Sequence, residues 1–161
     1  MTKTWVRIVT TALTIGVMVM IFCFSMETAE ESDATSGEIA AWVADRVRPE
    51  WRSYPPEEKK AYYDSVQYVI RKCAHFSEFA LLGISLRLCL ESWLGRRRWL
   101  TVCAWIGSTL YAMLDESHQT LVSGRSGQWK DVGIDSAGAL TGVLLTVLVL
   151  YLVRKRKTKS A

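Results

Sequence analysis

Three long apolar stretches stand out along the chain, and each approaches the length of a membrane-crossing helix. Residues 8–24 and residues 99–114 contain no charged side chain, and residues 132–153 contain only Asp135. About 20 predominantly apolar residues in a helix cross the hydrocarbon of a bilayer. The pattern therefore predicts helices that span a membrane rather than the core of a water-soluble domain.

A fourth stretch, residues 73–94, is less apolar. It contains four ionisable residues, which are His75, Glu78, Arg87 and Glu91. Arg87 and Glu91 lie near its end, and we expect their long side chains to reach the interface. We include this stretch as a span because three spans would place the basic run at residues 96–98 and the basic C-terminal tail on opposite sides of the membrane.

These stretches predict an all-α integral membrane protein, a single domain over residues 1–161 with four transmembrane helices. The predicted spans are about residues 6–25, 73–94, 99–115 and 132–153. The first apolar stretch follows Lys3 and Arg7, as the core of a signal peptide would, but it is longer than a usual signal core. We therefore expect it to be retained as a span.

The distribution of charge predicts the orientation. With four spans, both tails and the turn at residues 95–98 lie on one side, and these short stretches carry basic residues and no acidic residue. Because basic residues in short loops mark the cytoplasmic side, we expect a protein of the cell membrane with both termini in the cytoplasm. The net charge of +4 then says little about nucleic acid, and we expect no nucleic-acid partner. The basic C-terminal tail is expected to contact anionic lipid headgroups.

Residues 26–72 form the predicted outer loop. Residues 27–33 are acidic and polar and are predicted to be a linker. Residues 38–47 have apolar side chains at helical spacing before Pro49, which predicts a short extracytoplasmic amphipathic helix. This helix lies either on the outer leaflet of the membrane or against the spans.

A second helix start follows in the same outer segment. Pro55 and Pro56 precede Glu57 and Glu58, and prolines in the first turn together with acids near the positive end favour a helix beginning here. We expect this helix to continue into the span that begins near residue 73.

Small residues predict how the last span packs. Gly138 and Gly142 are four residues apart, a spacing that lets two membrane helices approach closely. Asp131 and Asp135 lie on the same stripe of this helix, so we expect their carboxylates to turn toward the bundle.

Ionisable and amide side chains gather at the predicted outer ends of three spans. Such groups are costly near hydrocarbon and need partners or water, so they are the main functional clue. The candidate catalytic residues are His75, Glu78, Asp115, Glu116 and His118. The candidate ligand-binding residues are Arg71, Lys72, Gln119, Arg125, Asp131 and Asp135.

Three interpretations of this cluster remain open. It is a network of ion pairs that ties the helices together, a catalytic site with a histidine base, or a pocket that binds an amphiphile. Arg125, between Gly124 and Gly127, either clamps an anion or pairs with Asp131. We expect no metal site and no cofactor, because no H-E-x-x-H motif and no phosphate-type glycine signature occurs.

Three ordered motifs resemble those of the VanZ-like family. They are residues 71–83 (RKCAHFSEFALLG), residues 115–119 (DESHQ) and the loop at residues 124–127 (GRSG), which Asp131 and Asp135 follow. The chain departs from the family pattern at Met26 and Glu27, and at Ser123. The resemblance implies a small helical membrane protein of bacteria, and some members are associated with lowered susceptibility to teicoplanin and related lipoglycopeptides. It also implies that the candidate residues other than Arg71 and Lys72 are signature positions.

The residues and the resemblance together predict a protein that binds an amphiphile at the outer leaflet. The expected ligands are a membrane lipid, a cell-wall precursor lipid or a lipoglycopeptide, with a contribution to teicoplanin-type resistance. The alternative is a membrane-embedded hydrolase or transferase that acts on a lipid head group, with His75 or His118 as the general base.

Overall fold

The computed structural model describes residues 4–124 and 127–159, and the regular elements of this part of the chain are all helices. These elements are α1 (Thr4–Ser25), α2 (Ala29–Val47), the 3-10 helix η1 (Pro49–Ser53), α3 (Pro56–Leu94), α4 (Leu100–Gln119) and α5 (Trp129–Lys159). The predicted all-α fold class is confirmed for the described residues. The prediction that one helix begins at the two prolines and continues into the span is also confirmed.

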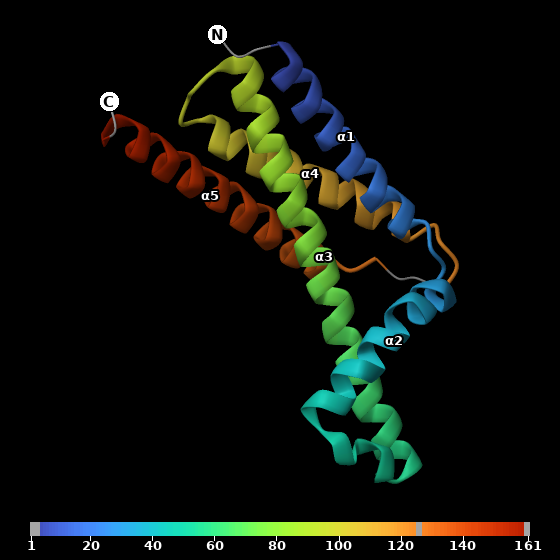
Figure 1. Ribbon diagram of the computed structural model, residues 1–161. Coiled ribbons are helices and arrows are strands. Elements are labelled where there is room, and N and C mark those ends of the chain that lie inside the picture. Colours follow the sequence, from blue (N-terminus) through green and yellow to red (C-terminus); the bar gives the residue numbers. More distant parts are fainter. Residues whose placement is uncertain (1–3, 125–126, 160–161) are drawn as a thin grey trace.

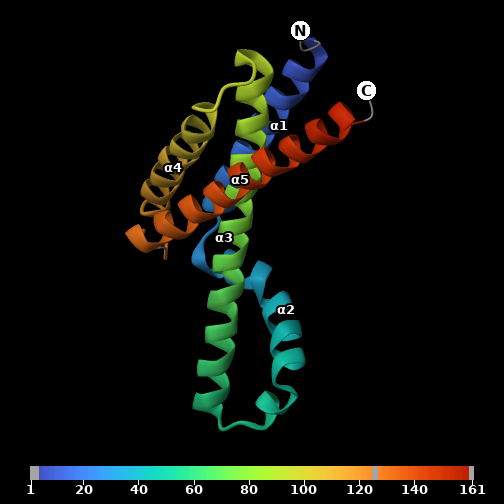
Figure 2. The same ribbon diagram turned by 90° about the vertical axis from the view of Figure 1, so that its left-hand side faces the viewer.

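The molecule consists of a helical bundle and a projecting hairpin (Figures 1 and 2). α1, α4, α5 and the second half of α3 form the bundle, whereas α2, η1 and the first half of α3 extend from one end of it. α1 begins and α5 ends at the other end of the bundle (Figure 1). At 1.5 Å per residue the 39 residues of α3 extend about 58 Å, nearly twice the roughly 30 Å of a bilayer's hydrocarbon. One half of α3 therefore belongs to the hairpin.

Three helices of the described chain are long and apolar enough to cross a membrane, namely α1, α3 and the part of α5 from Trp129 to Thr158. The stretch at residues 73–94, the least apolar of the four predicted spans, lies within one of them. α4 is not in this set, and Asp115 and Glu116 lie in its last turns. Four crossings therefore stay a prediction.

The outer segment is more helical than the sequence interpretation allowed. Residues 29–33, predicted as a linker, form the first turns of α2 because Thr28 and Glu31 make a capping box. The backbone N–H of Thr28 donates to Glu31 Oε2 at 2.8 Å, and the N–H of Glu31 donates to Thr28 Oγ1 at 3.3 Å. These two hydrogen bonds satisfy exposed donors at the helix start. The backbone N–H and the hydroxyl of Thr28 both donate to the Glu31 carboxylate and lower the pKa of Glu31. The predicted loop at residues 26–72 is therefore mainly a hairpin of two helices.

α2 packs along the first half of α3, before the stretch predicted as a span, and its predicted position at the outer leaflet or against the spans stays a prediction. Ala40 and Ala44 are fully buried, and these small side chains mark the inner face of α2. The hydroxyl of Tyr63 in α3 donates to the carbonyl of Gly37 in α2 at 3.1 Å. Trp42, on the opposite face of α2, and Ile39, at the side of the helix, are more than half exposed.

The tip of the hairpin is fixed by Asp45. Its Oδ1 accepts hydrogen bonds from Trp51 Nε1 at 2.7 Å and Arg52 Nε at 2.8 Å, and its Oδ2 accepts from Arg52 Nη2 at 2.7 Å. The Arg52 guanidinium and the Trp51 indole stabilise the ionised carboxylate and lower the pKa of Asp45 to about 2. The Trp51 ring also stacks on Tyr63 with 5.9 Å between centroids.

α3 and α5 cross at close range, as the glycine spacing predicted. A Cβ atom at Gly138 would lie 2.2 Å from the carbonyl oxygen of Phe76, and one at Gly142 would lie 2.0 Å from that of Ala80. On α3, a Cβ atom at Gly83 would lie 2.3 Å from the carbonyl oxygen of Ala139. Real side chains at these three positions would force the helices apart, so the glycines set the contact.

Arg87 lies inside the bundle near one of its ends, and its predicted reach to the membrane interface stays a prediction. It is buried and pairs with Glu91 at 2.8 Å, and Glu91 also contacts Arg154 of α5. Nearby, Arg7 of α1 donates to the carbonyl of Ser92 at 3.2 Å. These contacts connect three helices at the end of the bundle that holds both chain ends.

Candidate functional site

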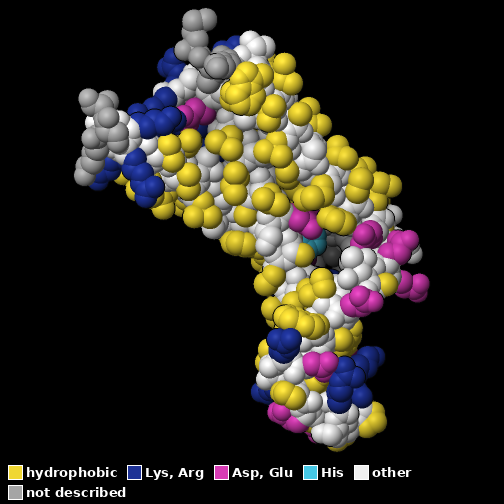
Figure 3. All heavy atoms as spheres, in the orientation of Figure 1, with side chains coloured by type: hydrophobic (Ala, Val, Ile, Leu, Met, Phe, Trp, Pro, Cys, Tyr) yellow, Lys and Arg dark blue, Asp and Glu magenta, His cyan; other side chains and the backbone are white. Residues whose placement is uncertain are grey.

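The candidate site lies where α2 leaves the bundle, around the middle of α3, the beginning of α5 and the end of α4. Figure 3 shows apolar side chains over the bundle, basic side chains at the end with both termini, and acidic side chains beside a histidine at the level where α2 departs. Successive helices of the bundle run in opposite directions, so the end of α4 and the beginning of α5 lie at the same end of the bundle. The polar residues of these two helix ends therefore lie close to those in the middle of α3.

His75 and Asp135 connect α3 to α5. The distance from His75 Nδ1 to Asp135 Oδ1 is 3.9 Å. Asp135 is fully buried, and neither of its oxygens has a hydrogen-bond partner within the described part of the chain. His75 keeps about a quarter of its side chain exposed, at 26%. An imidazole with one edge toward a buried acid and another toward open space is able to bind a polar group from outside.

Lys72 and Asp131 form a second link between the same two helices. Lys72 Nζ lies 2.5 Å from Asp131 Oδ1, and both side chains are mostly buried. The ammonium also lies over the ring of Tyr68, at 5.0 Å from its centroid. Asp131 thus has Lys72 as a cation partner, which the sequence had left open among Arg71, Lys72, Arg125 and the histidines.

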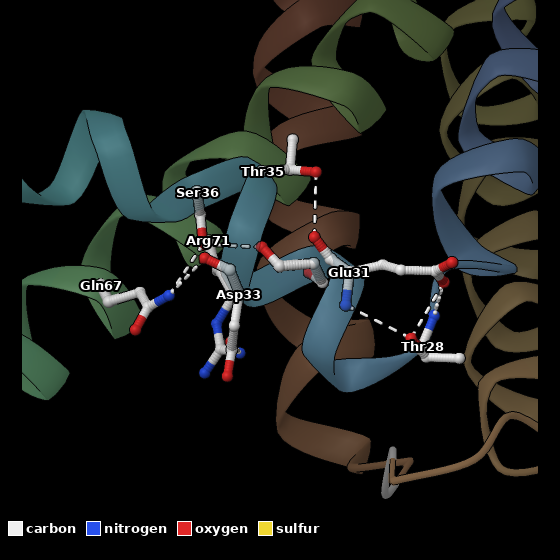
Figure 4. A network of polar contacts seen from close by, with 8 residues as sticks. Thr28, Glu31, Asp33, Thr35, Ser36, Gln67 and Arg71 are labelled. Carbon is white, nitrogen blue, oxygen red and sulfur yellow. Dashed lines mark hydrogen bonds and ion pairs between the residues drawn. The ribbon is translucent and has the colours of Figure 1, made fainter.

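Arg71 joins the site to α2 through a set of polar contacts (Figure 4). Its Nη1 atom lies 2.6 Å from Asp33 Oδ1. One turn earlier, the side-chain amide of Gln67 donates to the carbonyl of Asp33 at 3.0 Å and to Ser36 Oγ at 3.1 Å. Gln67 is buried, so these bonds hold the first turns of α2 against α3.

Two buried acids near the end of α4 accept hydrogen bonds from the residues that follow them. Asp115 accepts a hydrogen bond from Gln119 Nε2 at 2.9 Å, one turn away. Glu116 accepts one from the backbone N–H of Gln128 at 2.5 Å, which ties the loop before α5 to α4. All three α4 side chains, Asp115, Glu116 and Gln119, are buried.

Two further candidate residues, His118 and Arg125, are not among the contacts described so far. The His118 ring lies against Phe22 of α1, with 4.9 Å between centroids, and its Nδ1 atom has no hydrogen-bond partner in the described chain. Arg125 lies outside the described residues, so its predicted role as an anion clamp stays a prediction. Before it, Gly124 has a φ of +76°, a conformation that glycine adopts readily, and it turns the chain there.

Two cavities meet at His75. The polar cavity has a volume of about 240 Å³ and lies between α2, α3 and the start of α5. Its lining includes Arg71, Lys72, His75, Gln119 and Asp131. The α2 cavity, of about 190 Å³, is mainly apolar and is lined by residues that include Phe24, Ile39, Ile70, Ala74 and Glu78. Ser32, Arg71 and His75 line both cavities.

Several lining residues were absent from the sequence prediction, namely Ser32, Tyr68 and Gln128. Ser32 was missed because the beginning of α2 was taken for a linker. The T-x-x-E pattern at residues 28–31 was the available signal, since it is the signature of a helix start. Among the described residues, no group of three or more His, Cys, Asp or Glu side chains is placed to hold a metal ion.

The apolar helices and the polar site at one end of their bundle define a multi-pass helical membrane protein. A family model described as VanZ/LLP1 matches residues 10–151, and the chain belongs to this family. The resemblance seen in the sequence motifs is thereby confirmed. Comparison with curated proteins and with solved structures gives no match.

Proposed function

We propose that this protein binds an amphiphilic molecule at the two cavities that meet at His75. The observation that carries the proposal is the shared wall of a polar and an apolar cavity, formed by Ser32, Arg71 and His75. A polar head lies in the polar cavity, and a hydrocarbon chain lies in the α2 cavity between α2 and α3. Ligand sites are commonly concave and apolar with a few polar groups that fix orientation.

The cations of the polar cavity favour a head with anionic oxygens. Arg71 and Lys72 are each engaged by one carboxylate, Asp33 and Asp131 respectively. A guanidinium carries five N–H donors and an ammonium three, so both cations are able to bind a phosphate or carboxylate while they keep these partners. His75 adds a third donor at the shared wall.

We further propose four crossings with both termini in the cytoplasm. α3 ends at the end of the bundle where both chain ends lie, and α5 begins at the other end (Figure 1). If α3 and α5 cross the membrane, α4 must also cross it to connect them. The basic residues of the tails and of the turn at residues 95–98 then mark the cytoplasmic side, and the site faces outward.

An outward site beside the lipid suits the ligands expected from the family, a cell-wall precursor lipid or a lipoglycopeptide. A contribution to teicoplanin-type resistance is part of this proposal. Expression in a susceptible host tests it: the wild-type protein should lower teicoplanin susceptibility, and His75→Ala at equal abundance should not. If the wild-type protein and His75→Ala lowered susceptibility equally, the site around His75 would have no part in resistance.

Binding itself is tested with purified protein in a neutral maltoside detergent, by native mass spectrometry with lysophosphatidic acid as a one-chain phosphate amphiphile. We expect Lys72→Gln to weaken binding by about tenfold, since a charged hydrogen bond contributes about 1.5–3 kcal/mol. Lys60→Gln, which removes the same charge from the exposed end of α3, is the matched control and should bind as the wild type does. Absence of binding to the wild-type protein would refute the proposal.

A second candidate is a hydrolase or transferase that acts on a lipid head group. The observation that favours it is the proximity of His75 to Asp135, because a carboxylate that orients an imidazole prepares a general base. His118 is less suited to this role, since its ring lies against Phe22. Release of a head group from the bound lipid by the wild-type protein, and its loss in His75→Ala, would support this function over binding alone.

A further inference from the structure

A third hollow lies on the other side of the polar cavity. This α5 groove, of about 440 Å³, runs between α3 and α5 and is mainly apolar. Its lining includes Tyr68, Val69, Cys73, Phe76 and Ile134. It shares Tyr68 and Lys72 with the polar cavity, just as the α2 cavity shares Arg71 and His75 with it.

The three hollows are arranged in order around α3. Successive residues of a helix are 100° apart, so Tyr68, Lys72 and His75 form one stripe, which faces the polar cavity. Ala74 lies to one side of this stripe, at the α2 cavity, and Cys73 lies to the other side, at the α5 groove. The polar cavity is therefore flanked by an apolar hollow on each side.

We propose that the ligand is a two-chain lipid with a phosphate in its head group. This inference rests on the proposed function and specifies its ligand. The phosphate lies among Arg71, Lys72 and His75, one chain enters the α2 cavity, and the second chain follows the α5 groove. A cell-wall precursor lipid or a lipoglycopeptide with one hydrocarbon chain fills only one of the two apolar hollows.

Charge and surface both support this occupant. All three basic side chains around the polar cavity lie at its borders with the apolar hollows, Arg71 and His75 toward α2 and Lys72 toward the groove. Tyr68 and Val69 are more than half exposed at the groove, so a chain that covers them removes apolar surface from contact with headgroups and water. A glycerol phosphate that carries two acyl chains matches this order of apolar, basic and apolar surface.

The test compares phosphatidic acid with lysophosphatidic acid of the same acyl chain, and with inorganic phosphate, on the purified protein in neutral maltoside. Native mass spectrometry should give an affinity for the two-chain lipid at least about tenfold higher than for the one-chain lipid, because a second chain buries many more methylenes. Inorganic phosphate should not compete at equal concentration. Equal affinities of the two lipids would overturn this inference and leave the proposed function in place, whereas binding of neither would refute both.

Two matched substitutions locate the chains. Ala74→Trp fills the α2 cavity and Cys73→Trp fills the α5 groove, and each should lower the affinity for the two-chain lipid by about tenfold or more. Leu110→Trp, on the exposed face of α4, is the control for added bulk and should not change it. If Cys73→Trp left both the affinity and the melting temperature unchanged, the claim that a second chain lies in the α5 groove would be overturned. The effect of Ala74→Trp on the affinity would then show whether one chain lies in the α2 cavity.

Discussion

His75 Nδ1 lies 3.9 Å from Asp135 Oδ1, and the carboxylate is fully buried while the imidazole is partly open to two cavities. The effect of removing this acid on stability distinguishes a binding site from a purely structural ion-pair network. Removing one member of a buried ion pair that holds helices together is expected to cost about 3–5 kcal/mol. If Asp135 serves ligand binding instead, its removal is not expected to lower the free energy of unfolding by this amount.

We therefore predict that Asp135→Asn has a free energy of unfolding between that of the wild type and about 3 kcal/mol above it, because an acid that is buried without a hydrogen-bond partner is replaced by an uncharged side chain of the same shape. Lipid binding should weaken several-fold, since His75 loses its neighbouring acid. Thermal unfolding in detergent measures the first effect, with Asp64→Asn on the exposed part of α3 as the control. A large fall in stability would favour the ion-pair network instead.

The glycines of α5 provide a stability test with an internal control. Gly142→Ala places a Cβ atom against the backbone of α3, where Ala80 O would be 2.0 Å away, and should destabilise the protein by about 1–3 kcal/mol or more. Gly133→Ala lies on the same helix with nothing within 4 Å of the added atom. This second variant should be neutral or stabilised by up to about 1 kcal/mol, because alanine favours a helix. Equal melting temperatures of the two variants would mean that α3 and α5 do not cross as described.

The lowered pKa of Asp45 predicts that the stability of the hairpin tip depends on pH. Its pKa is lowered from 3.8 to about 2 by Arg52 and Trp51, so its contribution to stability is present above the ordinary pKa and is lost as the pH falls to about 2. Carboxyl NMR of Asp45 should show a midpoint near pH 2 in the wild type and a higher one in Arg52→Gln. A wild-type midpoint near 3.8 would show that the contact with Arg52 does not form.

Topology is tested by impermeant maleimide labelling of intact cells, in a protein whose native cysteines are replaced by serine. Cysteines placed at Glu58 and at Ser123 should react, and one placed at Arg97 should react only after the cells are broken. Labelling of position 123 only in broken cells, with position 58 still accessible, would show that α4 does not cross. Labelling of position 97 in intact cells would reverse the orientation.

Much of the fold follows from local sequence signals. The prolines and acids at residues 55–58 mark where α3 begins, and Gly95, with a φ of +74°, lies where it ends. The spacing of Gly138 and Gly142 indicated close packing and was confirmed. The beginning of α2 was missed although its capping box was present, because an acidic polar stretch is also typical of a linker.

The partners within the site were harder to predict. Helical spacing places Arg71 and His75 on one stripe, but it does not say how that stripe is rotated toward α2 or α5. The rotation is set by the glycine contacts, which bring Asp131 to Lys72 and Asp135 to His75. The contact of Glu91 with Arg154 was likewise not predicted, because helical spacing within α3 does not show which residue of α5 lies opposite. The functional roles of the candidate residues stay predictions.

The central claim is that an amphiphile lies with its chain beside Ala74 and its head beside Lys72. A lysophosphatidic acid with a photoreactive diazirine in the middle of its chain tests this most directly, by cross-linking to the purified protein followed by peptide mapping. We predict that the label is concentrated on residues 36–43 of α2 and residues 70–78 of α3, and that it falls sharply in Ala74→Trp. A label spread along the lipid-facing surfaces of α1 and α4, and unchanged in that variant, would contradict the claim.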